Sequence, residues 1–242
     1  MEKLLAGKTV LITGGTSVLG RVFVRKALAQ GARVFATFYR NQEEAAALEK
    51  AGAEIFELDL SDTRAIDQFA SAVKTRTKQL DILLHNAACV RDHTIQNLTE
   101  EEWDTVLAVN LKAPYYLTKK VLSLLFKSES ARVLMITSRA AVNGAAGASN
   151  YAASKAGIIG LVKSMAAELG KKKILVNAVN PGYMQSAMTE SLPDFVVEQH
   201  LAASPLNRRS DPAEVADFLV YLSSAAAAGV TGQVLHWESR KI

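Results

Sequence analysis

The chain has 242 residues, a mass of 26.1 kDa and a formal net charge of +4 at pH 7. Its 49 % hydrophobic and 21 % charged residues are typical of a globular protein with one large or two small domains. No run of about 18 apolar residues is present, which excludes a membrane-spanning helix, and a single cysteine excludes an internal disulfide.

Short apolar runs alternate with longer helical stretches along the chain. Strand-like runs lie at residues 9–13, 33–37, 54–58, 81–85, 132–137, 174–179 and 233–237. Most of these runs are continuously apolar, which is typical of strands buried on both faces of a sheet. The alternation predicts one α/β domain over residues 1–242, a doubly wound sheet with helices on both faces.

Helical spacing of apolar residues is clearest over residues 21–30 and 101–127. A further helix is predicted to start at the sequence D-P-A-E, where Asp211 is the cap, Pro212 the first helical residue and Glu214 the third residue after the cap. Residues 183–205 interrupt the alternation as a long, loop-like segment that contains Pro193. We predict that this segment is a lid over a binding site.

The stretch T-G-G-T-S-V-L-G, residues 13–20, connects the first strand to the first helix. A glycine-rich turn in this place can hold a phosphate group on backbone N–H groups. Ligands of an open α/β sheet bind beyond the carboxyl ends of the strands, where Asp59 also lies, after the third strand. Its carboxylate would either accept a hydrogen bond from an adenine amino group or cap the next helix, and both interpretations stay open.

Tyr151 and Lys155 stand four residues apart in Y-A-A-S-K, which places them on one face of a helix. A nearby ammonium favours the phenolate, so Lys155 is expected to lower the pKa of Tyr151 toward the range of a general acid–base. Ser138 ends a strand and would hold a carbonyl or alcohol oxygen beside the phenol. Alternatively, Tyr151 and Lys155 lie on a surface helix on which the lysine reaches the solvent.

These motifs make the chain similar to the short-chain dehydrogenase/reductase family over nearly its full length, and above all to its 3-oxoacyl-carrier-protein reductases. The matching stretches are T-G-G-T-S-V-L-G, D-L at 59–60, H-N-A-A at 85–88, V-N-L at 109–111, Ser138, Y-A-A-S-K at 151–155, N-P-G at 180–182 and V-T-G-Q at 230–233. The resemblance implies a Rossmann-type parallel sheet of about seven strands, a nicotinamide cofactor, and a homotetramer or homodimer.

The resemblance also implies roles for individual residues. Tyr151 would donate the proton to a carbonyl oxygen, Ser138 would orient the carbonyl, Lys155 would bind the nicotinamide ribose, and Asn110 would position Lys155 through water. Asn86 would line the cofactor channel, and Ser186 stands where relatives have a threonine that contacts the carboxamide or the phosphates. The implied cofactor-binding residues are Gly14, Thr16, Ser17, Val18, Leu19, Gly20, Arg40, Asp59, Leu60, Asn86, Ala87, Tyr151, Lys155, Pro181, Gly182 and Ser186.

The chain departs from the family pattern at three places. Val18 and Ala88 replace glycines beside the cofactor, and the chain ends in H-W-E-S-R-K-I where many relatives have two glycines. Valine adopts no positive φ without strain and its side chain takes space, so we expect Val18 to weaken cofactor binding without abolishing it.

We therefore expect an NADP(H)-dependent oxidoreductase that interconverts a ketone and a secondary alcohol, with a 3-oxoacyl thioester as the favoured substrate. NADP(H) is favoured because no carboxylate ends the second strand and Arg40 follows it. The alternatives are a reductase of another small ketone, such as a sugar, a steroid or a polyketide-like compound, and a cofactor-binding protein without turnover.

The remaining polar residues carry no further site. Cys89 is expected to pack near a strand end in a protein of the reducing cytoplasm, whose N-terminal residues show no secretion signal. The lysines at 171–173 are interpreted as a solvated helix end, and no nucleic-acid or membrane partner is expected. The four histidines lack the spacing of metal ligands.

Overall fold

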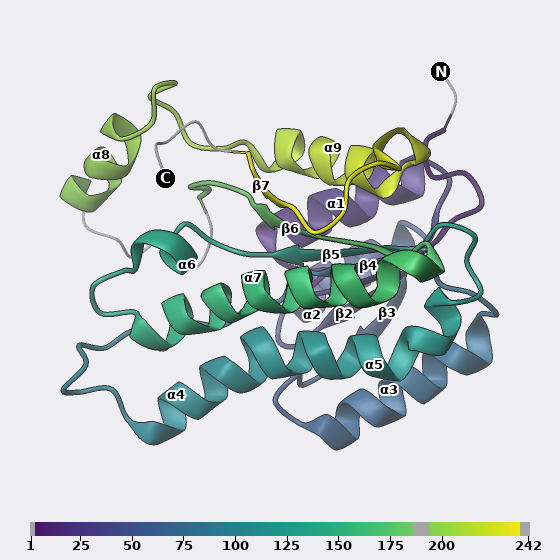
Figure 1. The fold of residues 1–242 in the computed structure, drawn as a ribbon, viewed down its shortest axis with the longest axis horizontal. Helices are drawn as coiled ribbons and strands as arrows, with labels where there is room; N and C mark the ends of the chain where they lie inside the picture. The colour runs from purple at the N-terminus through teal and green to yellow at the C-terminus, as the bar shows by residue number, and fades with distance from the viewer. Residues whose placement is uncertain (1–2, 186–193, 238–242) are drawn as a thin grey trace.

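The computed structural model describes residues 3–185 and 194–237 (Figure 1). A sheet of seven parallel strands runs through it in the order β3-β2-β1-β4-β5-β6-β7. The strands are β1 (Thr9–Thr13), β2 (Arg33–Phe38), β3 (Glu54–Glu57), β4 (Ile82–His85), β5 (Arg132–Ile136), β6 (Leu175–Asn180) and β7 (Val234–His236). Each lies within one residue of its predicted bounds, so the doubly wound Rossmann-type sheet is confirmed.

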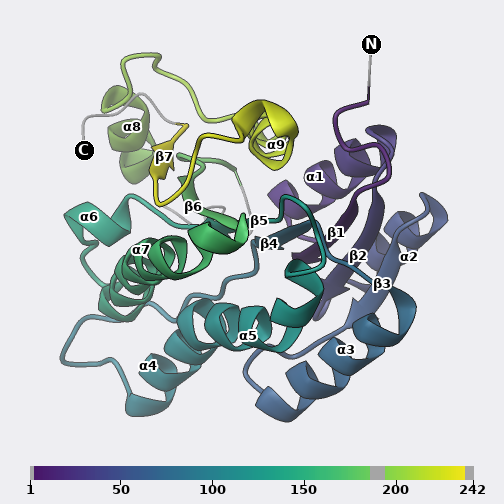
Figure 2. The same cartoon turned by 45° about the vertical axis from the view of Figure 1, so that its right-hand side comes forward.

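Helices cover both faces of this sheet (Figures 1 and 2). Helices α3, α5 and α7 pack on one face, and α1, α2 and α9 pack on the other. The α-helices are α1 (Val18–Ala29), α2 (Gln42–Lys50), α3 (Thr63–Arg76), α4 (Glu100–Leu107), α5 (Ala113–Leu125), α6 (Ala140–Asn143), α7 (Ser149–Leu169), α8 (Asp194–Ala202) and α9 (Pro212–Ser223).

The strands are continuously apolar because successive side chains enter two different cores. Leu11 of β1 packs with the core under α3, α5 and α7, whereas Val10 and Ile12 pack with the core under α1 and α9. All three side chains are fully buried. The sheet order reverses between β1 and β4, and the crevice of such a sheet lies at the carboxyl ends of these strands.

Two predicted helices differ from the observed ones. The helix expected from residue 21 begins at Val18, because the side chain of Ser17 caps it there. The single helix expected over residues 101–127 is interrupted by a π turn, Ala108–Lys112, which joins α4 to α5. A π turn holds one extra residue, which a helical period read from sequence does not reveal.

The start of α9 is confirmed at its cap. Asp211 Oδ1 accepts a hydrogen bond from the N–H of Ala213 at 2.7 Å, and Pro212 is the first helical residue. Glu214 does not bond back to the cap, and it pairs with Arg208 at 2.9 Å.

The segment predicted as a loop-like lid contains helix α8, so its loop character is wrong for residues 194–202. Pro193 and Ser186 lie outside the described residues. Within the described ranges, no helix combines the length and apolar character that a membrane crossing requires. These ranges also bring together no group of three histidine, cysteine, aspartate or glutamate side chains that could hold a metal ion.

Candidate active site

The turn after β1 leads directly into helix α1. Ser17 Oγ accepts a hydrogen bond from the N–H of Gly20 at 3.1 Å and so caps the helix. Val18 is the first helical residue, and the described residues with positive φ other than glycines are Lys173 and Asn207. The valine therefore has an ordinary backbone conformation, and the strain considered for this position does not arise.

Two glycines of this turn allow backbones to approach closely. Gly14 has a φ of 68°, and a Cβ placed on it would lie 2.9 Å from the Cα of Ala87. A Cβ placed on Gly20 would collide with the carbonyl oxygen of Gly14. The turn thus forms a backbone cradle at the N-terminus of α1, which fits the pyrophosphate of a dinucleotide.

Asn86 braces this cradle from the end of β4. Its side-chain Nδ2 donates hydrogen bonds to the carbonyl oxygen of Gly14 at 2.9 Å, to that of Thr13 at 3.2 Å and to Ser17 Oγ at 3.0 Å. The side chain is buried and directed at the phosphate loop. Asn86, which the sequence assigns to the cofactor channel, therefore acts on the loop that forms part of it.

Two threonines that the sequence prediction missed complete the same framework. Thr13 Oγ1 accepts the N–H groups of Asn86 and Ala87, both at 3.2 Å. The carbonyl oxygen of Thr37 accepts the N–H of Gly15 at 2.7 Å. Both threonines are buried near the carboxyl ends of apolar strands, and that pattern was the available signal for them.

Two predicted cofactor residues direct their side chains into or against a hydrophobic core. The side chain of Leu19 packs in the core under α1, and the side chain of Leu60 packs against the core under α3. Thr16 is half-buried in the phosphate loop.

Asp59 shapes the turn after β3. Its Oδ1 accepts the N–H of Ser61 at 2.8 Å and the Ser61 hydroxyl at 2.6 Å, while Oδ2 makes no hydrogen bond to the described residues. Helix α3 is capped by Asp62, whose Oδ1 accepts the N–H of Arg64 at 2.8 Å. The helix-cap interpretation of Asp59 is therefore wrong, and an acceptor oxygen remains at this edge of the sheet.

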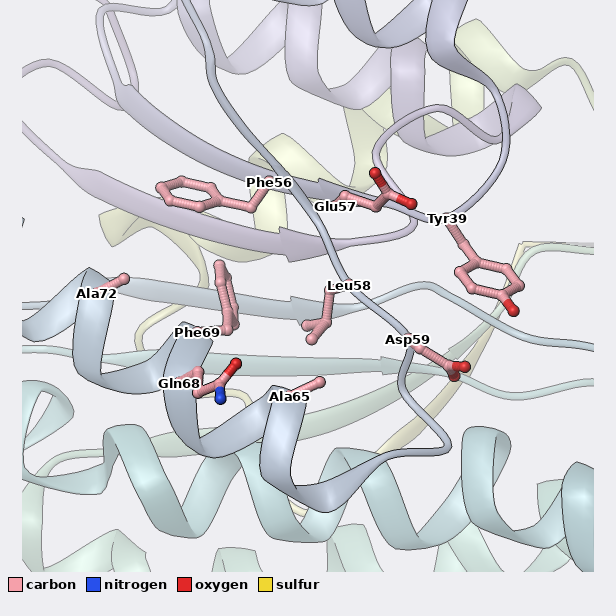
Figure 3. Close-up of a pocket in the computed structure, with 9 residues that line it drawn as sticks. All are labelled: Tyr39, Phe56, Glu57, Leu58, Asp59, Ala65, Gln68, Phe69 and Ala72. Carbon is pink, nitrogen blue, oxygen red and sulfur yellow. The ribbon is translucent and has the colours of Figure 1, made fainter.

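A cavity of about 320 Å³ lies between the edge strand β3 and helix α3. Figure 3 shows Tyr39 and Asp59 at one end and Phe56 and Phe69 at the other. The guanidinium of Arg40 lies over the Tyr39 ring, 5.1 Å from its centroid. The polar end of the cavity therefore adjoins the strand ends where the sequence predicts the adenosine part of the cofactor.

The catalytic candidates meet where β5 faces the start of α7. Ser138 follows β5, and its hydroxyl lies close enough to the phenol of Tyr151, in the first turn of α7, to lower the pKa of that phenol. Lys155 lies one turn further along, with Nζ 5.7 Å from the centroid of the Tyr151 ring. This ammonium is buried and donates a hydrogen bond to the carbonyl oxygen of Ile136 at 2.8 Å. The three side chains are thus gathered as predicted, and the surface-helix alternative is wrong.

The electrostatics of this group differ from the prediction. Burial raises the pKa of Tyr151, a hydrogen bond from Ser138 opposes that rise, and the charge of Asp92 adds to it. Burial lowers the pKa of Lys155 to about 8. The phenol pKa therefore lies above its ordinary value, because loss of hydration is the largest effect, and the lowering that the sequence assigns to Lys155 is not found.

Asn110 lies in the π turn and clamps the neighbouring loop. Its Oδ1 accepts the N–H of Cys89 at 2.8 Å, and its Nδ2 donates to the Cys89 carbonyl at 2.9 Å and to Ser154 Oγ at 3.2 Å. Ser154 precedes Lys155 on α7, so Asn110 positions the lysine's helix directly. Burial raises the pKa of the Cys89 thiol, which agrees with a packing role.

The end of β6 carries the last predicted cofactor residues. Pro181 is buried, and Gly182 has a φ of 78° with its N–H bonded to Asn180 Oδ1 at 3.2 Å. This arrangement holds a sharp turn that only glycine adopts without strain.

The four histidines each contact another side chain. Burial lowers the pKa of His85 to about 3, so that this ring is neutral. The partners are Thr118 for His85, Glu102 for His93, Tyr183 for His200 and Asn180 for His236.

A sequence model of the family described as enoyl-(acyl carrier protein) reductase matches residues 14–239. The chain belongs to the short-chain dehydrogenase/reductase family. It is accordingly an oxidoreductase of a family that binds a nicotinamide cofactor, and the glycine cradle at α1 fits that group.

Similar proteins cover nearly the whole chain. Nodulation protein G from Rhizobium sp. (strain N33) is 37 % identical over 234 residues, which are 96 % of each chain. The 3-oxoacyl-(acyl-carrier-protein) reductase FabG from Vibrio harveyi is 34 % identical over 234 residues, again 96 % of each chain. Among solved structures, RhlG of Pseudomonas aeruginosa in an NADP active-site complex has a TM-score of 0.91 at 28 % identity, covering 99 % of this chain and 98 % of that one.

Proposed function

We propose that the protein is an NADP(H)-dependent reductase that converts a ketone into a secondary alcohol. The observation that carries the proposal is the gathering of Ser138, the Tyr151 phenol and the buried Lys155 ammonium, whose Nζ lies 5.7 Å from the centroid of the Tyr151 ring. The group lies beyond the carboxyl ends of the strands, and the glycine cradle lies at the same end of the sheet, after β1.

The side chains divide the work of the reaction. Ser138 would donate a hydrogen bond to the carbonyl oxygen, and Tyr151 would transfer its proton to the same oxygen. The buried ammonium of Lys155 would stabilise the phenolate that this transfer leaves. The nicotinamide cofactor, when bound, supplies the hydride. The raised pKa of the Tyr151 phenol favours the reducing direction, because it keeps this proton donor protonated at neutral pH.

A 3-oxoacyl thioester is the substrate that we favour. Its support is the name of relatives such as the reductase from Vibrio harveyi, which matches 96 % of this chain. The test is steady consumption of NADPH with acetoacetyl-coenzyme A, measured beside a panel of small ketones. A clear preference for ketones without a thioester would assign the chain to another substrate class.

NADP(H) rather than NAD(H) is favoured by the end of β2. Arg40 is exposed, stacks on Tyr39 and makes no ion pair with a described residue, so its guanidinium is available to a 2′-phosphate. Arg40→Ala should weaken NADPH binding about tenfold and leave NADH binding unchanged, as measured by cofactor fluorescence. Equal affinity of the wild type for both cofactors would contradict this preference.

The second candidate is a cofactor-binding protein without turnover. Cofactor binding combined with no consumption of NADPH by any ketone would favour it. The intact Ser138, Tyr151 and Lys155 group argues against it, because binding alone does not require this geometry.

We also propose that the protein is a cytoplasmic homotetramer or homodimer. Residues 183–205 would act as a lid over the binding site. Tyr115 and Phe126 are large apolar side chains, 47 % and 49 % exposed on and beside α5, and they would be covered in such an assembly. Light scattering of the purified protein tests the assembly, and a monomer at micromolar concentration would contradict it.

A further inference from the structure

Arg139 is held rigidly beside the catalytic serine. The N–H of Ala140 donates to Ser138 Oγ at 3.2 Å and closes a tight turn around Arg139. The Arg139 carbonyl accepts the N–H groups of Val142 and Asn143 at 3.0 and 3.1 Å, which begins helix α6. Adjacent Cα atoms are about 3.8 Å apart, so this cation starts next to the group that orients the carbonyl.

The side chain of Arg139 has no hydrogen-bond or ion-pair partner among the residues that the structure describes. Its Nε is shielded from solvent without a hydrogen bond, and the side chain makes no hydrogen bond or ion pair with any described residue. Several other arginines differ, because Arg21, Arg25, Arg33, Arg76 and Arg208 each pair with a carboxylate. A shielded donor without an acceptor is unfavourable for the folded protein, and an anionic ligand would relieve that cost.

Arg139 forms no ion pair with a carboxylate of the described residues, including Asp92. Asp92 acts electrostatically on Tyr151, so it belongs to the same region, yet it forms no ion pair with Arg139 within 4.0 Å. Arg91 next to it is exposed, and its carbonyl oxygen accepts the Nδ2 donor of Asn150 at 2.8 Å, which fixes this loop to the start of α7.

We infer that Arg139 binds an anionic group that the ketone substrate carries close to its carbonyl, a carboxylate or a phosphate. The inference rests on the proposed reductase function but not on the favoured thioester, which carries no anion close to its ketone, and it points to a different class of ketone. A guanidinium suits this task because its planar fork makes two parallel hydrogen bonds to either group. Ser138 and Tyr151 hold the carbonyl, and Arg139 holds the anion and sets the orientation of the ketone.

The experiment compares ketones that differ only in charge. The pairs are 3-oxobutanoate with its methyl ester, 4-oxopentanoate with its methyl ester, and dihydroxyacetone phosphate with dihydroxyacetone. In the wild type with NADPH, kcat/KM should be at least about tenfold higher for the anionic member of one pair, and that pair identifies the carboxylate or the phosphate.

Variants separate the role of this cation from a general loss of charge. Arg139→Met should lower kcat/KM for the anionic ketone at least about tenfold, change the neutral one less than about twofold, and leave Tm unchanged or higher, because the shielded unpaired donor is removed. Arg139→Lys should retain an intermediate preference, because it keeps the charge and loses the fork. Arg64→Met, at a side chain 91 % exposed on α3, is the matched control and should behave as wild type.

Equal losses for anionic and neutral ketones in Arg139→Met, or a large drop in its Tm, would overturn the inference and assign Arg139 a structural role. Calorimetry without turnover separates this failure from failure of the proposed function. In the presence of NADPH, which cannot accept a hydride from an alcohol, 3-hydroxybutanoate and glycerol 3-phosphate should be compared with the methyl ester and glycerol. Arg139-dependent binding of an anion supports the site even if no ketone is reduced, and equal binding of charged and neutral compounds refutes it.

Discussion

The two halves of the site are built in opposite ways. On the cofactor side, Asn86 gives its side-chain donors to the phosphate loop and Thr13 accepts two backbone N–H groups, so the polar atoms satisfy one another. On the substrate side, Arg139 Nε and Ser149 Oγ are shielded from solvent without a hydrogen bond. The hydrogen bonds of the phosphate loop are thus completed by the chain itself, whereas these two shielded donors near the catalytic residues have no acceptor among the described residues.

The largest effect on turnover should come from loss of the Tyr151 phenol oxygen, the proposed proton donor. Tyr151→Phe removes the phenol hydroxyl, which is expected to lower kcat about 10²–10⁴-fold while the affinity for NADPH stays unchanged. The measurements are turnover and cofactor titration, with exposed Tyr115→Phe as the control. If Tyr151→Phe retained a near-native kcat, Tyr151 would not be the proton donor.

Adding a single methyl group to the phosphate loop should weaken cofactor binding strongly. Gly20→Ala places a Cβ against the carbonyl of Gly14, so we expect NADPH affinity to fall about a hundredfold and Tm to fall with it. Gly160→Ala on α7 is the matched control, since a Cβ there has no neighbour within 4 Å and should stabilise the helix by about 0.5–1 kcal/mol. Similar affinities of both variants would show that the cradle is adaptable.

The burial of Lys155 should be visible in stability. Its pKa falls from 10.5 to about 8 on folding, so the unfolded chain binds the proton more tightly between these values and stability rises with pH across that window. Without cofactor, Lys155→Met should be more stable than wild type by about 1–3 kcal/mol below pH 8, and this advantage should vanish by pH 10.5. Urea denaturation at several pH values measures it, with exposed Lys163→Met as control. A constant difference across the window would contradict the burial effect.

The smallest effect concerns Val18, where the structure removes one of two reasons for weak binding. The helical backbone excludes strain, and the space occupied by the side chain remains. Val18→Gly should therefore tighten NADPH binding by about 1 kcal/mol, roughly fivefold in Kd. Calorimetric titration with NADPH measures this change. An unchanged or weaker affinity of the Val18→Gly variant would mean that the loop accommodates the valine side chain.

The sheet was predictable because its signal is local. Val10, Leu11 and Ile12 are all apolar, and that run can be read without knowing which core receives each residue. The spacing of Tyr151 and Lys155 is local in the same sense. Thr13 was missed because its hydroxyl serves N–H groups more than 70 residues away, and the phenol pKa was misjudged because burial depends on the assembled fold.

The π turn at Ala108–Lys112 makes the length of this segment as important as its composition. Each α-helical residue advances the chain by about 100° around the axis, so deleting one residue here would restore a regular helix and rotate its upstream part against its downstream part. Asn110 would then lose its contacts with Cys89 and Ser154. A substitution in this turn can have a small effect on the site, but an insertion or deletion there changes the junction between α4 and α5 in one step.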